Sequence, residues 1–163
     1  MKIRNAVIPG SFDPVTMGHL DVIERASSMF ERVYVTAFSN ADKKGSMFSA
    51  EEKLHMLKLA TAQLDNVICS VESGLTAVFA KEHDAVIIKG IRNGTDLDYE
   101  MTMYGINRAV EGVDTMFVPA KQEYMHISST FVREMLRYEH DFEGLVPAPV
   151  YRYLCEEWKN SST

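Results

Sequence analysis

The alternation of short apolar runs with helical patterns constrains the fold more than any other feature of the sequence. Five runs are brief and apolar, as buried strands are: Asn5–Ile8, Arg32–Phe38, Val67–Val71, Ala85–Ile88 and Thr115–Val118. Strands separated by helices favour a parallel sheet with right-handed crossovers and helices on both faces. The sequence therefore predicts an α/β fold, a Rossmann-like doubly wound domain with a five-stranded parallel sheet.

Helical patterns fill the intervals between these runs and continue after the fifth one. Apolar residues recur at helical spacing from Leu20 to Phe30, and again from Leu54 to Leu64 after a capping box at Ser49. Further helices are expected at 76–83, 96–110, 129–138 and 149–159. No long linker, internal repeat or low-complexity tract interrupts the pattern. Residues 1–163 are therefore expected to form a single domain that ends in C-terminal helices.

The composition limits the classes of partner. With 17 Lys and Arg against 23 Asp and Glu, the chain carries a formal net charge of −6, which gives no broad attraction for a nucleic acid. A small anionic ligand needs only a local basic pocket. The N-terminus lacks the apolar region of a signal peptide, and no stretch approaches the ~18 apolar residues of a membrane span. We expect a cytoplasmic protein that binds neither nucleic acid nor membrane.

Ligands of doubly wound sheets bind beyond the carboxyl ends of the strands, where the strand order reverses. The segments that follow the expected strands there are 9–19, 40–48, 89–100 and 119–130, and all are rich in glycine, hydroxyl groups or cations. Neither the dinucleotide-binding glycine pattern nor the P-loop pattern occurs. The sequence predicts an anion site at this edge that uses neither motif.

The first of these segments brings a hydroxyl and an imidazole to a helix N-terminus. Ser11 and His19 could both face an anion there, because the first backbone N–H groups of a helix have no intrahelical acceptor. The alternative is that Gly10, Pro14 and Gly18 merely make turns and that His19 lies on the surface.

The later segments supply cations and further hydroxyl groups. Lys89 and Arg92 flank a glycine and bring charge to a strand end that would otherwise be wholly apolar. Lys43 lies in a loop, where lysines are commonly just solvated. Hydroxyl residues occupy all of 128–130 at a helix start, which is more than capping requires.

Four motifs together resemble one known family. PGSFDP, TMGH, IKGIRN followed by DYE, and ISST followed by arginine occur in the order and spacing of the bacterial phosphopantetheine adenylyltransferases, over essentially the whole chain. The resemblance implies a nucleotidyltransferase that moves the adenylyl group of ATP to 4′-phosphopantetheine. The products would be dephospho-coenzyme A and pyrophosphate, in the penultimate step of coenzyme A synthesis. It also implies Mg²⁺ arriving with ATP, and a homohexamer.

The resemblance implies roles for individual residues as well. His19 would be catalytic and would stabilise the transition state, while Ser11, Lys43, Thr76 and Lys89 would hold the acceptor. The ATP site would comprise Ser11, Phe12, His19, Gly90, Ile91, Arg92, Glu100, Tyr124, Met125, His126, Ile127, Ser128, Ser129 and Thr130.

The chain departs from the family pattern at two places. Lys89 stands where the family usually has arginine, which keeps the charge but loses the planar fork that grips phosphate. Thr130 replaces a frequent serine and keeps the hydroxyl. No metal site of the protein's own is expected, because Asp13, Asp96 and Glu100 lack ligand spacing.

The chemistry of the implied reaction agrees with the residue types. An acceptor phosphate is already ionised, so its in-line attack on the α-phosphorus needs positioning and charge stabilisation but no protein nucleophile. Two other assignments remain open. A relative such as a nicotinate-mononucleotide adenylyltransferase or a glycerol-phosphate cytidylyltransferase would use the same nucleotide half-site with another acceptor, and a nucleotide sensor would bind without catalysis.

Overall fold

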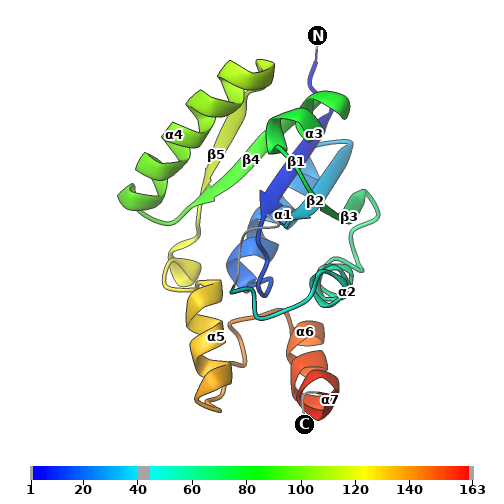
Figure 1. Cartoon of the computed structure of the whole chain (residues 1–163), viewed down its shortest axis with the longest axis vertical. Helices are drawn as coiled ribbons and strands as arrows, with labels where there is room; N and C mark the ends of the chain where they lie inside the picture. The colour runs from blue at the N-terminus through cyan, green and yellow to red at the C-terminus, as the bar shows by residue number, and fades with distance from the viewer. Residues whose placement is uncertain (1, 40–44, 162–163) are drawn as a thin grey trace.

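Five parallel strands form one sheet in the order β3-β2-β1-β4-β5 (Figure 1). The structure is a computed structural model that describes residues 2–39 and 45–161. The strands are β1 (Asn5–Gly10), β2 (Arg32–Phe38), β3 (Val67–Glu72), β4 (Ala85–Ile91) and β5 (Thr115–Pro119). The predicted α/β fold with a parallel sheet is confirmed, and the strand order reverses between β1 and β4.

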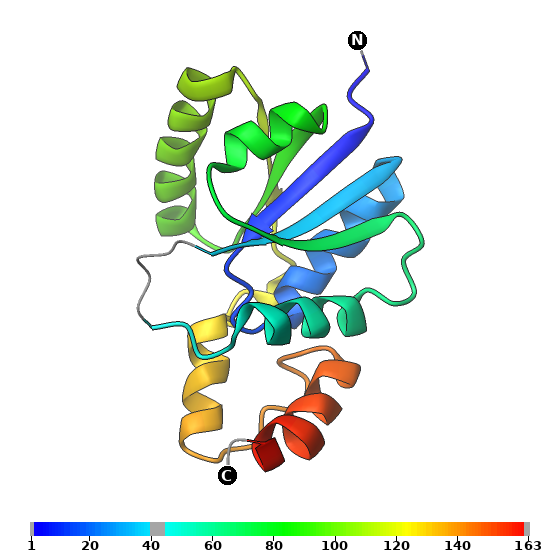
Figure 2. The same ribbon diagram turned by 45° about the vertical axis from the view of Figure 1, so that its right-hand side comes forward.

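Helices cover both faces of the sheet (Figure 2). α1 (Met17–Met29) and α2 (Ala50–Ala60) pack on one face, whereas α3 (Thr76–Glu82) and α4 (Gly94–Glu111) lie on the other. The C-terminal part lies beyond the carboxyl ends of the strands (Figure 1). It contains η1 (Gln122–Tyr124), α5 (Ser129–Arg137), α6 (Ala148–Tyr153), the π-helical turn η2 (Leu154–Trp158) and α7 (Lys159–Ser161).

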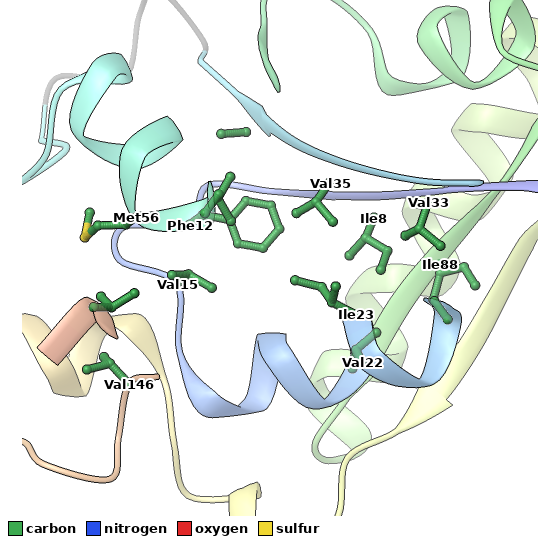
Figure 3. Packing of buried hydrophobic residues seen from close by; sticks show 14 of the residues in the cluster. Ile8, Phe12, Val15, Val22, Ile23, Val33, Val35, Met56, Ile88 and Val146 are labelled. Atoms are coloured by element: carbon green, nitrogen blue, oxygen red, sulfur yellow. The ribbon is translucent and has the colours of Figure 1, made fainter. Parts of the chain in front are cut away.

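The alternation of side chains along β1 produces two separate cores. Ala6 and Ile8 point to the α1 side, where they join a large cluster with Val22 and Ile23 of α1 (Figure 3). Val7 points to the other side and joins a smaller cluster with α3. Burial on both faces accounts for the nearly continuous apolar character of the strands.

Local signals set the helix boundaries. The expected capping box at Ser49 is present, since Ser49 Oγ accepts from Glu52 N and Ser49 N donates to the Glu52 carboxylate. α4 ends at Gly112, whose φ of 70° is the left-handed conformation that favours glycine. No helix in the described ranges has the length and apolarity that crossing a membrane requires.

Four strands run further than the sequence predicts, β3 and β5 by one residue each and β1 and β4 by more. β1 continues from Ile8 to Gly10, and β4 continues from Ile88 to Ile91. Lys89 and Gly90 are therefore strand residues rather than part of a loop after the strand. The cause is backbone pairing with Phe117 and Val118 of β5, which does not depend on apolar side chains. The expected single helix at 149–159 is an α-helix interrupted by a π-helical turn.

Candidate active site

The site is a gap between two strands of the sheet. β1 and β4 are paired from Asn5 and Ala85 as far as Val7 and Ile87, and beyond that point their residues no longer pair with each other. A cavity of about 290 Å³ opens there, bounded by both strands, the N-terminus of α1 and the segment from Ala120 to α5. We call it the β1–β4 cavity. It lies where the strand order reverses, as the sequence predicts.

Most of the residues predicted to contact ATP line this cavity. They are Ser11, Phe12, His19, Gly90, Arg92, Glu100, Tyr124, Ile127, Ser128 and Ser129. Ile91, Met125, His126 and Thr130 belong to the same segments but do not line it. Thr16, Gly18 and Asp96 line the cavity although sequence reasoning assigned them no ligand. The TMGH motif already contains the first two.

A second cavity of about 300 Å³ lies between the sheet and α4. We call it the α4 cavity. Ser11, Thr76 and Lys89, which are predicted to bind the acceptor, line it, whereas Lys43 lies outside the described residues. Sequence reasoning missed its α4 and β5 wall, which consists of Tyr99, Met103, Tyr104, Asn107 and Thr115. Helical periodicity alone does not distinguish a cavity wall from a packed face.

The two cavities share one edge. Pro9, Gly10, Ser11, Lys89 and Glu100 line both of them. Gly10 must be small at this edge, because a Cβ there would lie 3.1 Å from the Phe12 ring. Ligands in the two cavities would therefore meet at Ser11 and Lys89.

His19 is held in one tautomer by the N-terminus of α1. The ring Nδ1 of His19 accepts a hydrogen bond from the backbone N–H of Thr16 at 3.0 Å. The backbone N–H of His19 donates to Thr16 Oγ1 at 3.3 Å, and the two bonds together form a capping box. Because Nδ1 is an acceptor, the ring proton resides on Nε2. The imidazole thus offers one N–H donor besides those of the backbone.

The surroundings of His19 keep it neutral. Removal from water, followed by the positive charges of Lys89 and Arg92, lowers the pKa of His19 to about 4. The Phe12 ring contacts the imidazole edge-on, with the ring centroids 4.9 Å apart. A neutral imidazole with a low pKa is a poor base near neutral pH but a stable hydrogen-bond donor.

Phe12 adopts a backbone conformation that an aromatic residue rarely takes. Its φ is 45°, and its side chain is 1% exposed. Burial among Ile8, Val15 and Met56 in the larger core compensates for the strain (Figure 3). The turn brings Ser11 and the Phe12 ring to the cavity.

Each cation of the cavity has an acidic partner on α4. Lys89 Nζ lies 3.2 Å from Glu100 Oε1. Arg92 donates through its backbone N and its Nε to Asp96 Oδ2, and its Nη1 donates to the Ile127 carbonyl. An entering anion would therefore find positive charge that is already oriented by carboxylates.

The three hydroxyl residues before and within α5 have separate structural partners. Ser128 is the N-cap and accepts from Phe131 N, Ser129 donates to the Pro14 carbonyl, and Thr130 accepts from Arg133. The backbone N–H groups of the first helical turn have no intrahelical acceptor. Ser128 and Ser129 place this helix N-terminus at the cavity wall, an arrangement that favours anions.

Asp13 serves the scaffold rather than the cavity. Its carboxylate accepts from Met47 N, Phe48 N and Ser46 Oγ, and it is 5% exposed. Arg133 approaches the same carboxylate to 3.6 Å and donates to the Asp13 carbonyl. These contacts join the first loop to the start of α2 and to α5.

The acidic residues of the cavity are paired with cations. No group of three or more His, Cys, Asp or Glu with ligand geometry occurs in the described ranges. The carboxylates that line the β1–β4 cavity, Asp96 and Glu100, are each engaged by a cation.

Comparison with known proteins gives a consistent result. A family model described as cytidylyltransferase-like matches residues 7–135. The phosphopantetheine adenylyltransferase of Streptomyces coelicolor is 41% identical over 159 residues, which is 97% of this chain and 99% of the relative. The enzyme of the same name from Thermobifida fusca is 42% identical over 146 residues, 89% of this chain and 88% of the relative. That of Corynebacterium glutamicum is 36% identical over 156 residues, 95% and 98% of the two chains.

Proposed function

The chain belongs to the phosphopantetheine adenylyltransferases within the cytidylyltransferase-like family, and from this membership we propose its reaction and the residues that perform it. The protein transfers the adenylyl group of ATP to 4′-phosphopantetheine. Dephospho-coenzyme A and pyrophosphate are formed in the penultimate step of coenzyme A synthesis. Residues 1–163 act as one nucleotidyltransferase domain built on a single sheet.

The shared edge of the two cavities is the observation that carries the proposal. ATP occupies the β1–β4 cavity, and phosphopantetheine occupies the α4 cavity with its phosphate at the shared edge. The acceptor phosphate then meets the α-phosphate beside Ser11 and Lys89. Two substrates held in this orientation need no protein nucleophile, since the attacking oxygen is already ionised.

His19 stabilises the charge that accumulates on the α-phosphate. Its Nε2–H is the donor, because Nδ1 is occupied by Thr16 N. The first backbone N–H groups of α1 and α5, together with Arg92, supply further positive potential for the triphosphate. His19 takes up no proton in this scheme, which agrees with its lowered pKa of about 4.

Lys89 binds the acceptor phosphate and changes its partner to do so. Its ammonium is paired with Glu100 before the acceptor enters. The α4 cavity continues past this pair between apolar and polar side chains, including Met103, Tyr104 and Asn107. Such a mixed lining suits a chain with alternating alkyl and amide groups, as pantetheine has.

Magnesium is part of the nucleotide substrate in this proposal. MgATP would carry the metal in on its phosphates, where it would supply positive charge for the leaving pyrophosphate. The protein contributes orientation through α1, α5 and Arg92.

A pyrophosphate-release assay with several acceptors tests the function. The protein with MgATP should release pyrophosphate with 4′-phosphopantetheine, and not with nicotinate mononucleotide or glycerol phosphate. Release only with another acceptor would reassign the enzyme to a relative that uses the same nucleotide half-site. ATP binding without release for any acceptor would identify a nucleotide sensor.

We also propose that the chain assembles with copies of itself as a homohexamer in the cytoplasm. α4 supports association, because none of the residues in this 18-residue helix is buried in the single chain. Its exposed apolar side chains include Leu97, Met101, Ile106 and Val110.

The state of the cysteines supports the cytoplasmic location. Cys69 and Cys155 are both free thiols, as a reducing compartment favours.

Light scattering coupled to gel filtration tests the assembly. Wild type should have the mass of a hexamer, and Ile106→Glu, which places a charge on the exposed face of α4, should lower that mass. Lys2→Glu changes charge on the N-terminal segment and serves as the control. A monomeric wild type, or an unchanged mass for Ile106→Glu, would contradict the proposal.

A further inference from the structure

One wall of the β1–β4 cavity is a segment that is tied down only near its two ends. Residues 120–129 contribute Ala120, Tyr124, Ile127, Ser128 and Ser129 to the cavity. At the far end, Arg92 donates to the Ile127 carbonyl and Ser129 donates to the Pro14 carbonyl. Within the described chain, no hydrogen bond or ion pair links residues 122–126 to another element.

At the other end, Ala120 N donates to the Ile91 carbonyl at 2.8 Å, and a buried carboxylate on α1 holds the residues on either side of Ala120. Asp21 is 3% exposed and lies on the helix that carries His19. Its Oδ2 accepts from Arg25 Nη1 at 3.0 Å, and the same Nη1 donates to the Pro119 carbonyl at 2.8 Å. Its Oδ1 lies 3.0 Å from Lys121 Nζ. Arg25, which Asp21 orients, therefore joins α1 to the end of β5, and Asp21 itself joins α1 to Lys121, the residue before η1.

Lys121 is the only partner of one buried oxygen in the part of the chain described. Asp21 Oδ1 accepts no hydrogen bond there, and its ion pair with the Lys121 ammonium is the one contact that compensates its charge. The hydrogen bond to Asp21 raises the pKa of Lys121, so the ammonium remains charged. The Lys121 side chain itself is 54% exposed and lines neither of the two cavities that meet at Ser11.

We propose that Asp21, acting through Lys121 and Arg25, is a positioning residue that sets the distance between α1 and the Ala120–Tyr124 wall and thereby determines the affinity for ATP. This inference rests on the proposed function in one respect, namely that ATP occupies the β1–β4 cavity. Asp21 touches neither substrate. It fixes the wall that carries Tyr124 relative to the helix that carries His19.

The expected change in ATP affinity depends on the fraction of molecules in which the Ala120–Tyr124 wall keeps the position seen in the structure. When the Lys121 contact is lost, residues 121–126 sample additional conformations, and only the fraction with Tyr124 in place binds ATP well. The apparent dissociation constant rises in inverse proportion to that fraction. No residue of this segment lines the α4 cavity, so the affinity of the protein for phosphopantetheine should not change.

A set of four variants separates positioning from simple stabilisation. Lys121→Met removes the tether and leaves a buried carboxylate oxygen unpaired. Lys121→Arg keeps the charge. Asp21→Asn/Lys121→Met removes the tether without leaving an unpaired charge, so it should recover thermal stability relative to Lys121→Met. Arg4→Met breaks the exposed Arg4–Glu31 ion pair, remote from both cavities, and is the matched control.

ATP binding is measured by calorimetry without acceptor, and KM and kcat are measured by pyrophosphate release. We expect Lys121→Met and the double variant to weaken ATP binding by about five- to twentyfold, as for loss of one charge-assisted contact. The KM for phosphopantetheine and kcat at saturating ATP should stay within about twofold. Lys121→Arg and Arg4→Met should match wild type.

Two outcomes would overturn the inference. Unchanged ATP affinity in Lys121→Met would exclude a positioning role. Recovery of ATP affinity together with stability in the double variant would show that the network is only structural. Failure of the proposed function would be seen separately, as wild-type protein that releases no pyrophosphate from ATP and phosphopantetheine.

Discussion

His19 is placed to stabilise charge and is unsuited to carry protons. The contact with Thr16 N fixes the proton on Nε2, and removal from water, together with the neighbouring cations, lowers the pKa of His19 and keeps the ring neutral. Sequence reasoning could identify His19 through the TMGH motif. It could not give the tautomer, because that depends on the backbone geometry of the turn before α1.

Replacing His19 by alanine should therefore lower turnover more than it weakens ATP binding. The contact strengthens only as charge develops on the α-phosphate, so kcat should fall by about 10²–10³ while the dissociation constant of ATP changes little. Steady-state kinetics and calorimetry measure the two quantities. Turnover equal to that of wild type, with the fold intact, would refute the catalytic role.

Lys89 should govern acceptor affinity. Lys89→Ala is expected to raise the KM for phosphopantetheine about ten- to hundredfold, since one charge-assisted hydrogen bond contributes about 1.5–3 kcal/mol. ATP affinity should change little, and Lys89→Arg should be tolerated. Lys89→Met/Glu100→Gln leaves the net charge of the pair unchanged, and its comparison with Lys89→Ala shows whether an unpaired Glu100 carboxylate adds to the effect. Loss of ATP binding with an unchanged acceptor KM would assign Lys89 to the nucleotide.

The residue scale also shows what a sequence leaves out. The contributions of Ser11, Arg92 and Glu100 were predictable, because these residues lie in motifs that follow strands. In the structure all three line the β1–β4 cavity. Phe12 was assigned to the nucleotide, but its positive φ depends on burial that only the assembled core provides. Asp21 gave no signal at all, since an acidic residue on a helix is ordinarily solvated.

At the scale of the element, α1 couples its own stability to the site. The N3 residue of its capping box is His19, so the group that closes the helix N-terminus is also the proposed catalytic donor. Protonation of Nδ1 would remove the acceptor of Thr16 N. It would also place a third positive charge beside Lys89 and Arg92.

Acid should therefore destabilise the protein through α1. The pKa of His19 falls from 6.5 to about 4 on folding, so between these values the unfolded chain binds more protons. The free energy of unfolding should decrease as pH falls through this window, by up to about 3 kcal/mol from this group. Urea titrations from pH 7 to 4 would measure it.

A comparison with His19→Gln isolates the contribution. That variant should lose less stability than wild type over the same range, because carboxylate effects common to both cancel. His140→Gln replaces an exposed histidine and should follow wild type. Parallel curves for wild type and His19→Gln would show that His19 does not titrate in this window.

The strand β4 is longer than the sequence predicts, because side chains and backbone pairing mark different ends. The unbroken apolar run ends at Ile88, where Lys89 and Gly90 interrupt it, but backbone pairing with β5 continues to Ile91. Gly90 fits because a Cβ there would lie 3.0 Å from the Val22 side chain of α1. A pattern of side chains predicts where a strand is buried, and not where its ladder of hydrogen bonds ends.

At the scale of the whole molecule, the fold class was predictable and the strand order was not. Alternation of strands and helices requires parallel pairing, but it does not state which strands are neighbours. The order β3-β2-β1-β4-β5 depends on which face each crossover helix covers. The two-cavity arrangement follows from that order, so it was visible only in the structure.

The molecule as a whole should acquire magnesium only with its nucleotide. Calorimetry of Mg²⁺ with nucleotide-free protein should show no stoichiometric binding, because the cavity carboxylates Asp96 and Glu100 are held by Arg92 and Lys89. ATP added with Mg²⁺ should bind. Tight one-to-one binding of Mg²⁺ alone would reveal a metal site that these ion pairs conceal.

The divergence of β1 from β4 has a consequence for how such proteins can change over evolutionary time. The β1–β4 cavity exists because two backbones part, so its outline is inherited with the connectivity of the chain and withstands most substitutions. The α4 cavity is outlined instead by side chains of one helix, such as Met103 and Asn107. Substitutions on that helix would change which acceptor molecule fits, while the nucleotide cavity stays the same. One ancestral fold could therefore transfer a nucleotide to many different acceptors.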